Sequence, residues 1–305
     1  MTLGEFDALF DELKTWGRWS DSRILGTLNH LAARQTTAAA GLVRSGRTVT
    51  LSLPINTEIG PDNPRPAVHS MSRNHPPAAA PGMVGFATDF LGIDFHGNCH
   101  SHIDALCHVS YRGELYDGVP ATSVGPAGAS VQTIDDLRHG LVGRGVMLDI
   151  PRLRGTAWLE PGEAVTGDEL EAAERDQDVR LEPGDIFVFR TGEHRRRLER
   201  GPWDMGKIGR AGLHPTALRL LAEREVAVFA PDGDGEVLPS PVNGVAAPIH
   251  CLQVVAMGMA TMDSLQLEDL AAVCEDEGRW EFLFLAAPLR ILAGTGSPLN
   301  PIAVF

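Results

Sequence analysis

The sequence predicts an α/β protein built around one hydrophobic core. Expected strands and helices alternate through the middle of the chain, which is the pattern of α/β folds. The run 186–190 is apolar without alternation, as in a strand that is buried on both faces. The 305 residues contain no low-complexity linker and no internal repeat. We therefore expect a single domain over residues 1–305, with residues 1–46 as a helical N-terminal extension.

The N-terminal extension is expected to contain two helices. Residues 5–13 have helical apolar spacing, and Asn29 can cap a second helix that stops at Gly46. A strand is expected to follow at residues 49–54.

Residues 55–82 are expected to form a long irregular loop. They hold six prolines and two histidines, His69 and His75. A long loop in a compact domain often covers a functional site. We expect this one to act as a lid that sets specificity, with His69 binding substrate. Trp19 is a second candidate for substrate contact, because aromatic side chains suit cyclic ligands.

The middle of the chain supplies the alternating elements. Thr166 can cap a helix with an acidic first turn, and a turn at 182–185 leads into the buried strand. The expected elements in order are a short helix at 133–139, a strand at 145–149, a helix at 166–174, a strand at 186–190, a helix at 214–223, a strand at 226–230 and an apolar helical run at 248–258.

Composition narrows the classes of function. The net charge of −14 argues against nucleic acid and anionic membranes, whose phosphates are bound by Lys and Arg. No run approaches the ~18 apolar residues of a membrane helix, and the N-terminus lacks signal-peptide features. The four cysteines lie in apolar surroundings without metal-type spacing, so we expect buried free thiols in the cytoplasm: Cys99, Cys107, Cys251 and Cys274.

The strongest functional signal is a cluster of four histidines and one aspartate in the window 96–108. If residues 94–105 form a strand, alternate side chains share one face, namely those of His96, Asn98, His100, His102 and Asp104. A single histidine on a strand is usually structural. Crowded imidazoles, however, repel one another when protonated and lose hydration when neutral, unless they bind something. The cluster predicts a site for a divalent metal such as Zn²⁺ or Mn²⁺, or an acid/base site.

Two downstream segments could complete the site. His250 begins the apolar helical run, where it could equally serve as a cap, and Asp263 follows it. The acidic tract 232–236 lacks the length and the closing glutamate of a calcium loop. We expect it to form a turn at a strand end that lines the pocket.

The segment from His102 to His108 resembles the second half of the motif His-x-Gly-Thr-His-x-Asp-x-Pro-x-His of the putative cyclase family. Members of that family include bacterial kynurenine formamidase, isatin hydrolase and a trans-dienelactone hydrolase. Further segments similar to its longer branch, of about 300 residues, begin at Trp16, Leu25, Tyr116, Pro183, Arg190, Asp232, Pro248, Ala287 and Gly294.

The resemblance implies a metal-dependent hydrolase with the swivelling β/β/α fold, a mixed sheet or barrel core with flanking helices, assembled as a homodimer or homotetramer. Position by position, His102 and Asp104 match metal ligands, and His108 matches either the general base or a ligand of a second metal. His250 matches a downstream histidine, and Asp263 stands where shorter members carry an acidic residue. We expect His250 and Asp263 to complete the metal site.

The motif also departs from the family pattern. Asn98 stands where the family has its first histidine ligand, and His100 stands where it has glycine. Because both positions would share one strand face, we expect His100 to replace the missing imidazole, with His96 a less favoured substitute.

These observations favour hydrolysis of an amide, lactam or lactone bond in a small, cyclic or aromatic substrate by metal-activated water. One Zn or Mn ion per chain is slightly preferred to two. A lyase or cyclase reaction on a polyketide-like ring is the second hypothesis. The third is a metal-free binding protein that has lost its ion through Asn98.

Overall fold

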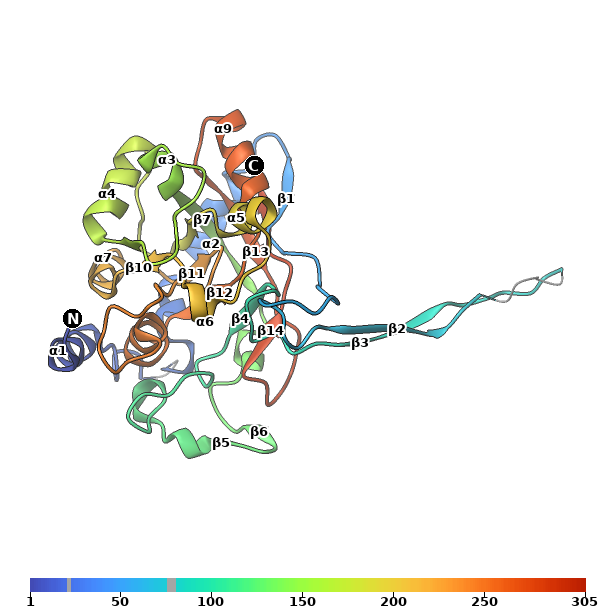
Figure 1. The fold of residues 1–305 in the computed structure, drawn as a ribbon, viewed down its shortest axis with the longest axis horizontal. Coiled ribbons are helices and arrows are strands. Elements are labelled where there is room, and N and C mark those ends of the chain that lie inside the picture. The colour runs from blue at the N-terminus through green and yellow to red at the C-terminus, as the bar shows by residue number, and fades with distance from the viewer. Residues whose placement is uncertain (21–22, 76–80) are drawn as a thin grey trace.

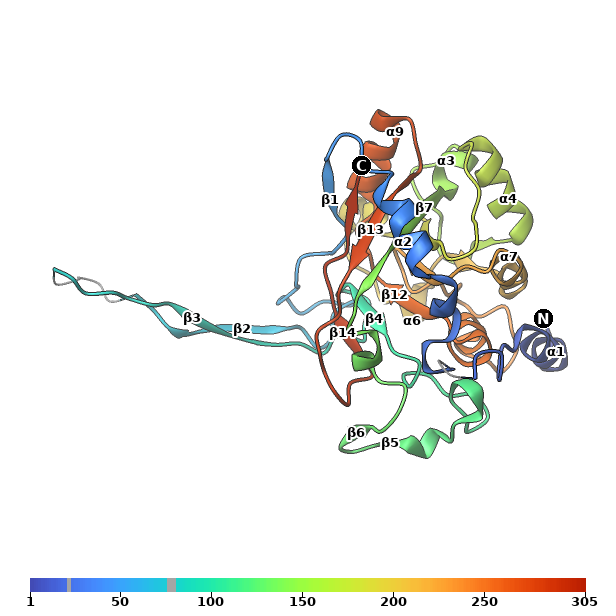
Figure 2. The ribbon, with the colours of Figure 1, turned by 180° about the vertical axis from the view of Figure 1, so that it is seen from behind.

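The computed structural model describes residues 1–20, 23–75 and 81–305. Within these residues, nine strands form one curled mixed sheet, with helices packed around it (Figures 1 and 2). This arrangement confirms the expected α/β fold class. The strands in sheet order are β1 (Thr48–Thr50), β15 (Ile302–Val304), β13 (Glu281–Ala286), β7 (Leu141–Asp149), β9 (Ile186–Arg190), β11 (Val228–Pro231), β12 (Ala260–Asp263), β4 (His102–Asp104) and β14 (Gly296–Pro298).

The central strands are buried on both faces of the sheet. In β9, Ile186 and Val188 belong to one hydrophobic core, while Phe187 and Phe189 belong to the core on the opposite face. Because successive side chains of a strand alternate, each face of the parallel strands β7, β9 and β11 needs its own cover. The expectation of a strand over 186–190 buried on both faces is confirmed.

The helices that provide this cover are short. In chain order the α-helices are α1 (Leu3–Leu13), α2 (Ala33–Ala40), α3 (Ile150–Arg154), α4 (Gly167–Asp176), α5 (Glu193–Arg200), α6 (Met205–Ile208), α7 (Leu218–Glu223), α8 (Pro248–His250) and α9 (Glu268–Glu277). A π-helical segment, η6 (Cys251–Met257), continues α8, and 3₁₀ turns lie at Arg23–His30, Tyr116–Gly118, Ala121–Ser123, Ile134–Leu137 and Pro215–Ala217. Within the described part of the chain, no helix combines the length and the apolar character needed to span a bilayer.

Several local expectations are confirmed and others are wrong. Thr166 and Glu169 form the capping box of α4. The second N-terminal helix, by contrast, begins after Ala32. Asn29 does not cap it, because Asn29 lies in a 3₁₀ turn and its Nδ2 donates to the carbonyl oxygen of Gly26 at 2.8 Å. All four cysteines are free and buried, as expected.

The expected strand over residues 94–105 is wrong in its extent, because only His102–Asp104 pairs with neighbouring strands. The preceding residues direct their polar groups to loops. His100 Nε2 lies 3.2 Å from the carbonyl oxygen of Asn56, and the amide of Gly97 donates to the carbonyl oxygen of Phe95 at 2.8 Å. Of the five side chains expected on one strand face, only His102 and Asp104 therefore share one.

The expectation of an irregular loop at residues 55–82 is wrong for residues 68–73, which form a strand, while residues 76–80 lie outside the described part of the chain. β2 (Val68–Arg73) and β3 (Thr88–Gly92) pair as an antiparallel hairpin that projects far from the body (Figures 1 and 2). Two further two-stranded pairs, β5 (Val124–Gly125) with β6 (Gly128–Ala129) and β8 (Ala164–Val165) with β10 (Gly212–Leu213), lie outside the main sheet.

Asp232 ties the end of β11 to the junction between β9 and α5. Its buried carboxylate accepts hydrogen bonds from the amide and hydroxyl of Thr191, at 3.0 and 2.7 Å, and from the amides of Gly192 and Glu193, at 2.7 and 3.2 Å. Burial raises the pKa of Asp232 to about 6, even though Thr191 lowers it. Asp232 thus satisfies buried amides at the start of α5.

Replacing Asp232 with alanine should lower the free energy of unfolding by roughly 3 kcal/mol, because several buried donors lose their acceptor. Urea unfolding followed by circular dichroism measures this loss. The control Asp168→Ala removes an exposed carboxylate from α4 and should cost less than about 1 kcal/mol. Equal losses in the two variants would contradict the role given to Asp232.

Candidate metal centre

Strand pairing brings two acidic residues and a histidine to one place. β4 lies between β12 and β14, and its register sets His102 opposite Asp263. Directly opposite residues of an antiparallel pair have their side chains on the same face, about 5 Å apart. Asp104 lies on that face too, since it is two residues beyond His102. His102 Nε2 is 3.6 Å from Asp263 Oδ2 and 3.5 Å from Asp104 Oδ1.

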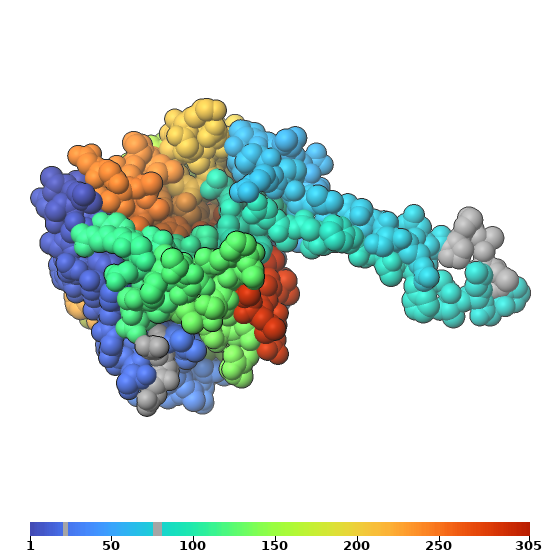
Figure 3. Space-filling view, turned by 90° about the horizontal axis from the view of Figure 1, so that it is seen from below, coloured from blue at the N-terminus to red at the C-terminus, as the bar shows by residue number. Residues whose placement is uncertain are grey.

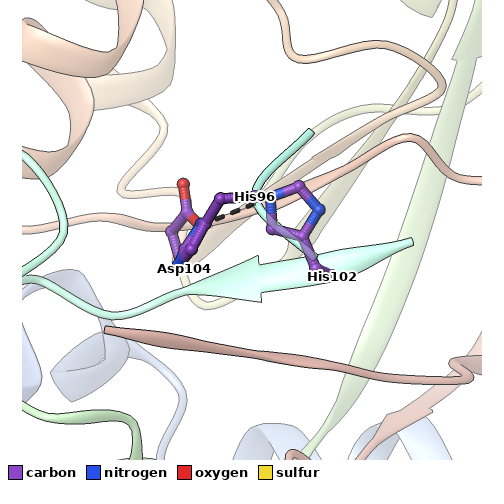
Figure 4. A group of neighbouring side chains, drawn as sticks. All are labelled: His96, His102 and Asp104. Carbon is purple, nitrogen blue, oxygen red and sulfur yellow. Dashed lines mark ion pairs between the residues drawn. The ribbon is translucent and has the colours of Figure 1, made fainter. Parts of the chain in front are cut away.

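His96 approaches His102 and Asp104 from the loop that precedes β4 (Figure 4). Its Nδ1 lies 2.9 Å from Asp104 Oδ1, and one ligand atom each from His96, His102 and Asp104 lie within 4.8 Å of one another. These three residues form the first group.

Asp104 also belongs to a second group, with His250 of α8 and Asp263 of β12. His250 Nε2 is 3.5 Å from Asp263 Oδ2 and 3.8 Å from Asp104 Oδ2. Because the two groups share Asp104, the site offers ligands for one ion or for two bridged by this carboxylate. Together the two groups make up what we call the metal group: His96, His102, Asp104, His250 and Asp263.

Several ligand atoms of the metal group are buried and make no hydrogen bond of good geometry: both oxygens of Asp104, Asp263 Oδ1 and His96 Nδ1, of which the last lies 2.9 Å from Asp104 Oδ1. Asp104 is only 1% exposed. A buried carboxylate without hydrogen bonds is costly unless a cation compensates its charge. Imidazole nitrogens and carboxylate oxygens are the donors that Zn²⁺ and Mn²⁺ accept. The residues therefore fit a divalent metal.

The carboxylates and imidazoles of the metal group favour one another's charged forms, as their pKa shifts indicate. Burial would raise the pKa of Asp104, but His96, His102, His108 and His250 together hold it well below its usual range. Burial would likewise lower the pKa of His250, but Asp263 and Glu236 raise it well above 6.5. Positive charge at this place is thus strongly favoured.

Two hydrogen bonds orient the imidazoles. His250 Nδ1 lies 3.0 Å from Glu236 Oε1, and the same carboxylate accepts from the amides of Ile249 and His250 at 3.1 and 2.8 Å. His102 Nδ1 lies 2.8 Å from the carbonyl oxygen of His100. In both rings Nε2 is left to face the carboxylates, as expected of a histidine whose second nitrogen is held by an outer partner.

His108 stands at the edge of the metal group. Its Nε2 is 3.7 Å from Asp104 Oδ2, and its ring stacks on that of His96 with 3.9 Å between centroids. His96 of the metal group and the neighbouring His108 are partly exposed, with side chains 22% and 31% accessible, so the group is open to small molecules on their side. Burial lowers the pKa of His108, although Asp104 opposes the shift.

The structure brings together four of the five predicted ligands: His102, Asp104, His250 and Asp263. It does not bring in His100, which faces Asn56, and His96, the less favoured substitute, lies in the group instead. The motif position occupied by Asn98 serves another purpose, because Asn98 Oδ1 accepts a hydrogen bond from buried Arg210 at 2.7 Å. His96 and His100 both precede the strand His102–Asp104, so loop contacts and not strand alternation decide which of them joins the group.

The predicted substrate residues have other partners in the structure. His69 is on the projecting hairpin, 3.0 Å from Asp89 Oδ2, and Trp19 packs against the cluster of Leu106, Tyr116 and Val254. Phe95 is half-buried, and the centroid of its ring lies 4.5 Å from that of His96. The sequence does not single out Glu236 as the partner of His250, and its place in the acidic tract is the one signal that points to it.

The comparisons with known proteins agree on one family. A model of the family described as putative cyclase matches residues 49–234. A solved structure described as a novel cyclase is 32% identical, with a TM-score of 0.86, and the match covers 97% of this chain and 99% of that one. None of the curated protein sequences matches.

Two hydrolase structures are more distant and share the fold. Isatin hydrolase A from Ralstonia solanacearum is 22% identical with a TM-score of 0.59, covering 88% of this chain and 96% of its own. A protein described as a predicted metal-dependent hydrolase from Bacillus stearothermophilus is 16% identical with a TM-score of 0.53, covering 84% and 97%.

Metal content should depend on His96 and not on His100. We expect His96→Ala to weaken Zn²⁺ or Mn²⁺ binding by at least about 10-fold, as loss of a direct ligand requires, and His100→Ala to retain the ion. Elemental mass spectrometry of protein purified without chelators, combined with titration against a competing chelator, measures both. Loss of metal in His100→Ala with retention in His96→Ala would restore the ligand set expected from the motif.

Proposed function

This chain belongs to the putative cyclase family, and we propose that it is a metal-dependent hydrolase that cleaves an amide, lactam or lactone bond in a small, cyclic or aromatic substrate. The observation that carries the proposal is the buried carboxylate of Asp104, which makes no hydrogen bond of good geometry and lies among imidazoles. A divalent ion bound there would act as a Lewis acid toward the carbonyl and lower the pKa of water.

His108 is the proposed general base. It is close to Asp104 and partly exposed, and its lowered pKa leaves the imidazole neutral and able to accept a proton at neutral pH. As the water oxygen bonds to the carbonyl carbon, His108 takes the proton that the water loses. It then gives this proton to the leaving nitrogen or oxygen when the C–N or C–O bond breaks.

Glu236 and the carbonyl of His100 are positioning groups. The carboxylate of Glu236 fixes the ring of His250, and the His100 carbonyl oxygen lies beside Nδ1 of His102. His100 thus contributes to the site through its backbone, while its side chain stays bound to the loop before β2. Outer partners of this kind set the tautomer and direction of a ligating imidazole.

Phe95 supports a cyclic or aromatic substrate. Its half-buried ring lies beside His96 on the accessible side of the metal group and offers an apolar face to a bound ring. The likeness to isatin hydrolase A, whose name indicates a cyclic substrate, agrees with this choice. The net charge of −14 argues for a small molecule over nucleic acid as the ligand.

A lyase or cyclase reaction is the second candidate, favoured by the description of the 32% identical structure as a cyclase. The same metal group would then stabilise an enolate. A metal-free binding protein has lost its main support, because His96 takes a place in the group while Asn98 bonds Arg210.

Hydrolysis should depend on metal and transfer oxygen from water. Screened against lactams, lactones and formamides, the protein should turn over at least one class, lose that activity to a chelator and regain it with Zn²⁺ or Mn²⁺. The product formed in H₂¹⁸O should carry one ¹⁸O atom by mass spectrometry. Turnover without ¹⁸O incorporation would favour the lyase, and turnover that survives complete metal removal would refute both reactions.

Replacing His108 with glutamine should lower kcat by about 10²- to 10⁴-fold, the usual contribution of a general base. Metal content should stay near that of the wild-type protein, because His108 is not needed to complete either group of ligands. His139→Gln, an exposed histidine outside the site, should leave kcat unchanged. Complete loss of the ion from His108→Gln would instead make His108 a metal ligand.

A further inference from the structure

His96 reaches the metal group from a loop, whereas the other four members lie on β4, on β12 or on α8. A loop residue needs contacts of its own to keep a ligand atom in place. Two neighbouring residues near the C-terminus supply them, Thr295 and Gly296. They belong to the segment that begins at Gly294, which has no role in the chemistry described above.

Thr295 lies beside the nitrogen of His96 that points away from the carboxylates. His96 Nε2 is 3.0 Å from Thr295 Oγ1, while Nδ1 is 2.9 Å from Asp104 Oδ1. The two ring nitrogens therefore have different partners, one on each side of the ring. Thr295 stands to His96 as an outer partner stands to a ligating imidazole.

The backbone of Thr295 is fixed although the chain before it is exposed. The loop of residues 287–294 lies at the surface (Figure 3), and within it Leu289 and Leu292 are 57% and 72% exposed. The carbonyl oxygen of Thr295 accepts a hydrogen bond from the amide of Ala105 at 2.9 Å, and β14 begins at the next residue. The hydroxyl is thus held on chain that is tied to the residue after Asp104.

Gly296 leaves room for the ring beside this hydroxyl. A Cβ atom at position 296 would lie 2.7 Å from His96 Cε1, well inside the ~3.5–4 Å of ordinary contacts between carbon atoms. It would also lie 2.6 Å from the carbonyl oxygen of Ile103, so β14 could not pair as closely with β4. A side chain here would displace the ring, the strand or both.

The three imidazoles of the metal group share one arrangement but use different nitrogens. Each has one nitrogen toward a carboxylate and the other beside an outer partner: Glu236 for His250, the carbonyl oxygen of His100 for His102, and Thr295 for His96. His102 and His250 direct Nε2 to the carboxylates, whereas His96 directs Nδ1.

We propose that Thr295 is a positioning residue, which holds His96 so that it binds the ion through Nδ1. The proposal rests on the metal-binding role given to the site above. A ring nitrogen that binds an ion carries no proton, so Nε2 keeps the hydrogen of the neutral ring and donates it to Thr295 Oγ1. This hydrogen bond keeps the ring from turning over to present Nε2 instead.

The same contact bears on the proposed base. The rings of His96 and His108 stack with 3.9 Å between centroids and only 2° between their planes. A shift of the His96 ring would therefore move His108 as well as a ligand nitrogen. Thr295 thus acts on both parts of the site through His96.

The test measures Zn²⁺ affinity of the full-length protein by competition with a chelator. Thr295→Val removes the hydroxyl and keeps a branched side chain, and it should weaken binding by about 10- to 100-fold, as loss of an outer partner does. Thr295→Ser keeps the hydroxyl and should bind Zn²⁺ like the wild-type protein.

The matched control is Thr36→Val. Thr36 lies on α2 and is half-buried like Thr295, and its hydroxyl donates to the carbonyl oxygen of Val142 at 2.7 Å. This variant also loses one hydroxyl hydrogen bond and should keep its affinity for Zn²⁺. In the presence of a chelator, Thr295→Val and Thr36→Val should lower the unfolding temperature by similar amounts. A much larger loss in Thr295→Val would make the role of Thr295 structural and would overturn the proposal.

A second measurement identifies the nitrogen that binds. In Zn²⁺-loaded protein labelled with ¹⁵N-histidine, long-range ¹H–¹⁵N spectra distinguish a protonated ring nitrogen from a metal-bound one. His96 should show a protonated Nε2 and a bound Nδ1, with the reverse in His102 and His250. The signals of His96 are identified by their loss in His96→Ala.

The outcomes separate this proposal from the proposed function. Equal Zn²⁺ affinity in Thr295→Val and Thr36→Val would overturn it and leave the metal group intact, as would a metal-bound Nε2 in His96. Wild-type protein that binds no Zn²⁺ would overturn it together with the metal-dependent reaction.

Discussion

The structure depends on one buried charge. Asp104 lies on β4, beside the edge strand β14, with both carboxylate oxygens buried. Four imidazoles approach it, three from residues 96–108 and that of His250 from α8. An isolated carboxylate in this position would cost several kcal/mol of stability. The same arrangement becomes favourable when a cation occupies the space between Asp104, the histidines and Asp263. The fold thus gathers carboxylates and imidazoles at one site whose charges a divalent metal would balance.

The sheet delivers the ligands by its order of strands. β4 is only three residues long, yet its place between β12 and β14 aligns His102 with Asp263 and turns Asp104 to the same face. Parallel strands β9 and β11 end nearby, where Asp232 ties their loops together and the following turn brings Glu236 to His250. Long-range pairing therefore places side chains that are far apart in the sequence.

Sequence patterns predict the parts that local physics determines. The capping box at Thr166 follows from residues close together in the sequence. The doubly buried strand 186–190 follows from its unbroken run of apolar residues, and the structure has both elements. The choice between His96 and His100 could not be predicted in this way. It depends on where the strand begins, which is set by pairing with β12 and by polar contacts to distant loops. The hairpin in the proline-rich segment is missed for a different reason: its strands pair with each other and are exposed, so no pattern of buried apolar residues marks them.

The hairpin of β2 and β3 runs into the segment that carries three of the five residues of the metal group. β3 ends at Gly92, and His96 follows shortly after it, with Asp94 between them paired to Arg65 at 2.7 Å. His96 precedes β4, so strand pairing does not hold it as it holds His102 and Asp104. Its ring is held by side chains instead, because Nδ1 lies 2.9 Å from Asp104 Oδ1 and Nε2 lies 3.0 Å from Thr295 Oγ1. A bound ion would therefore order His96 more than it orders the ligands on the strands, and metal affinity would depend on how well this loop is held.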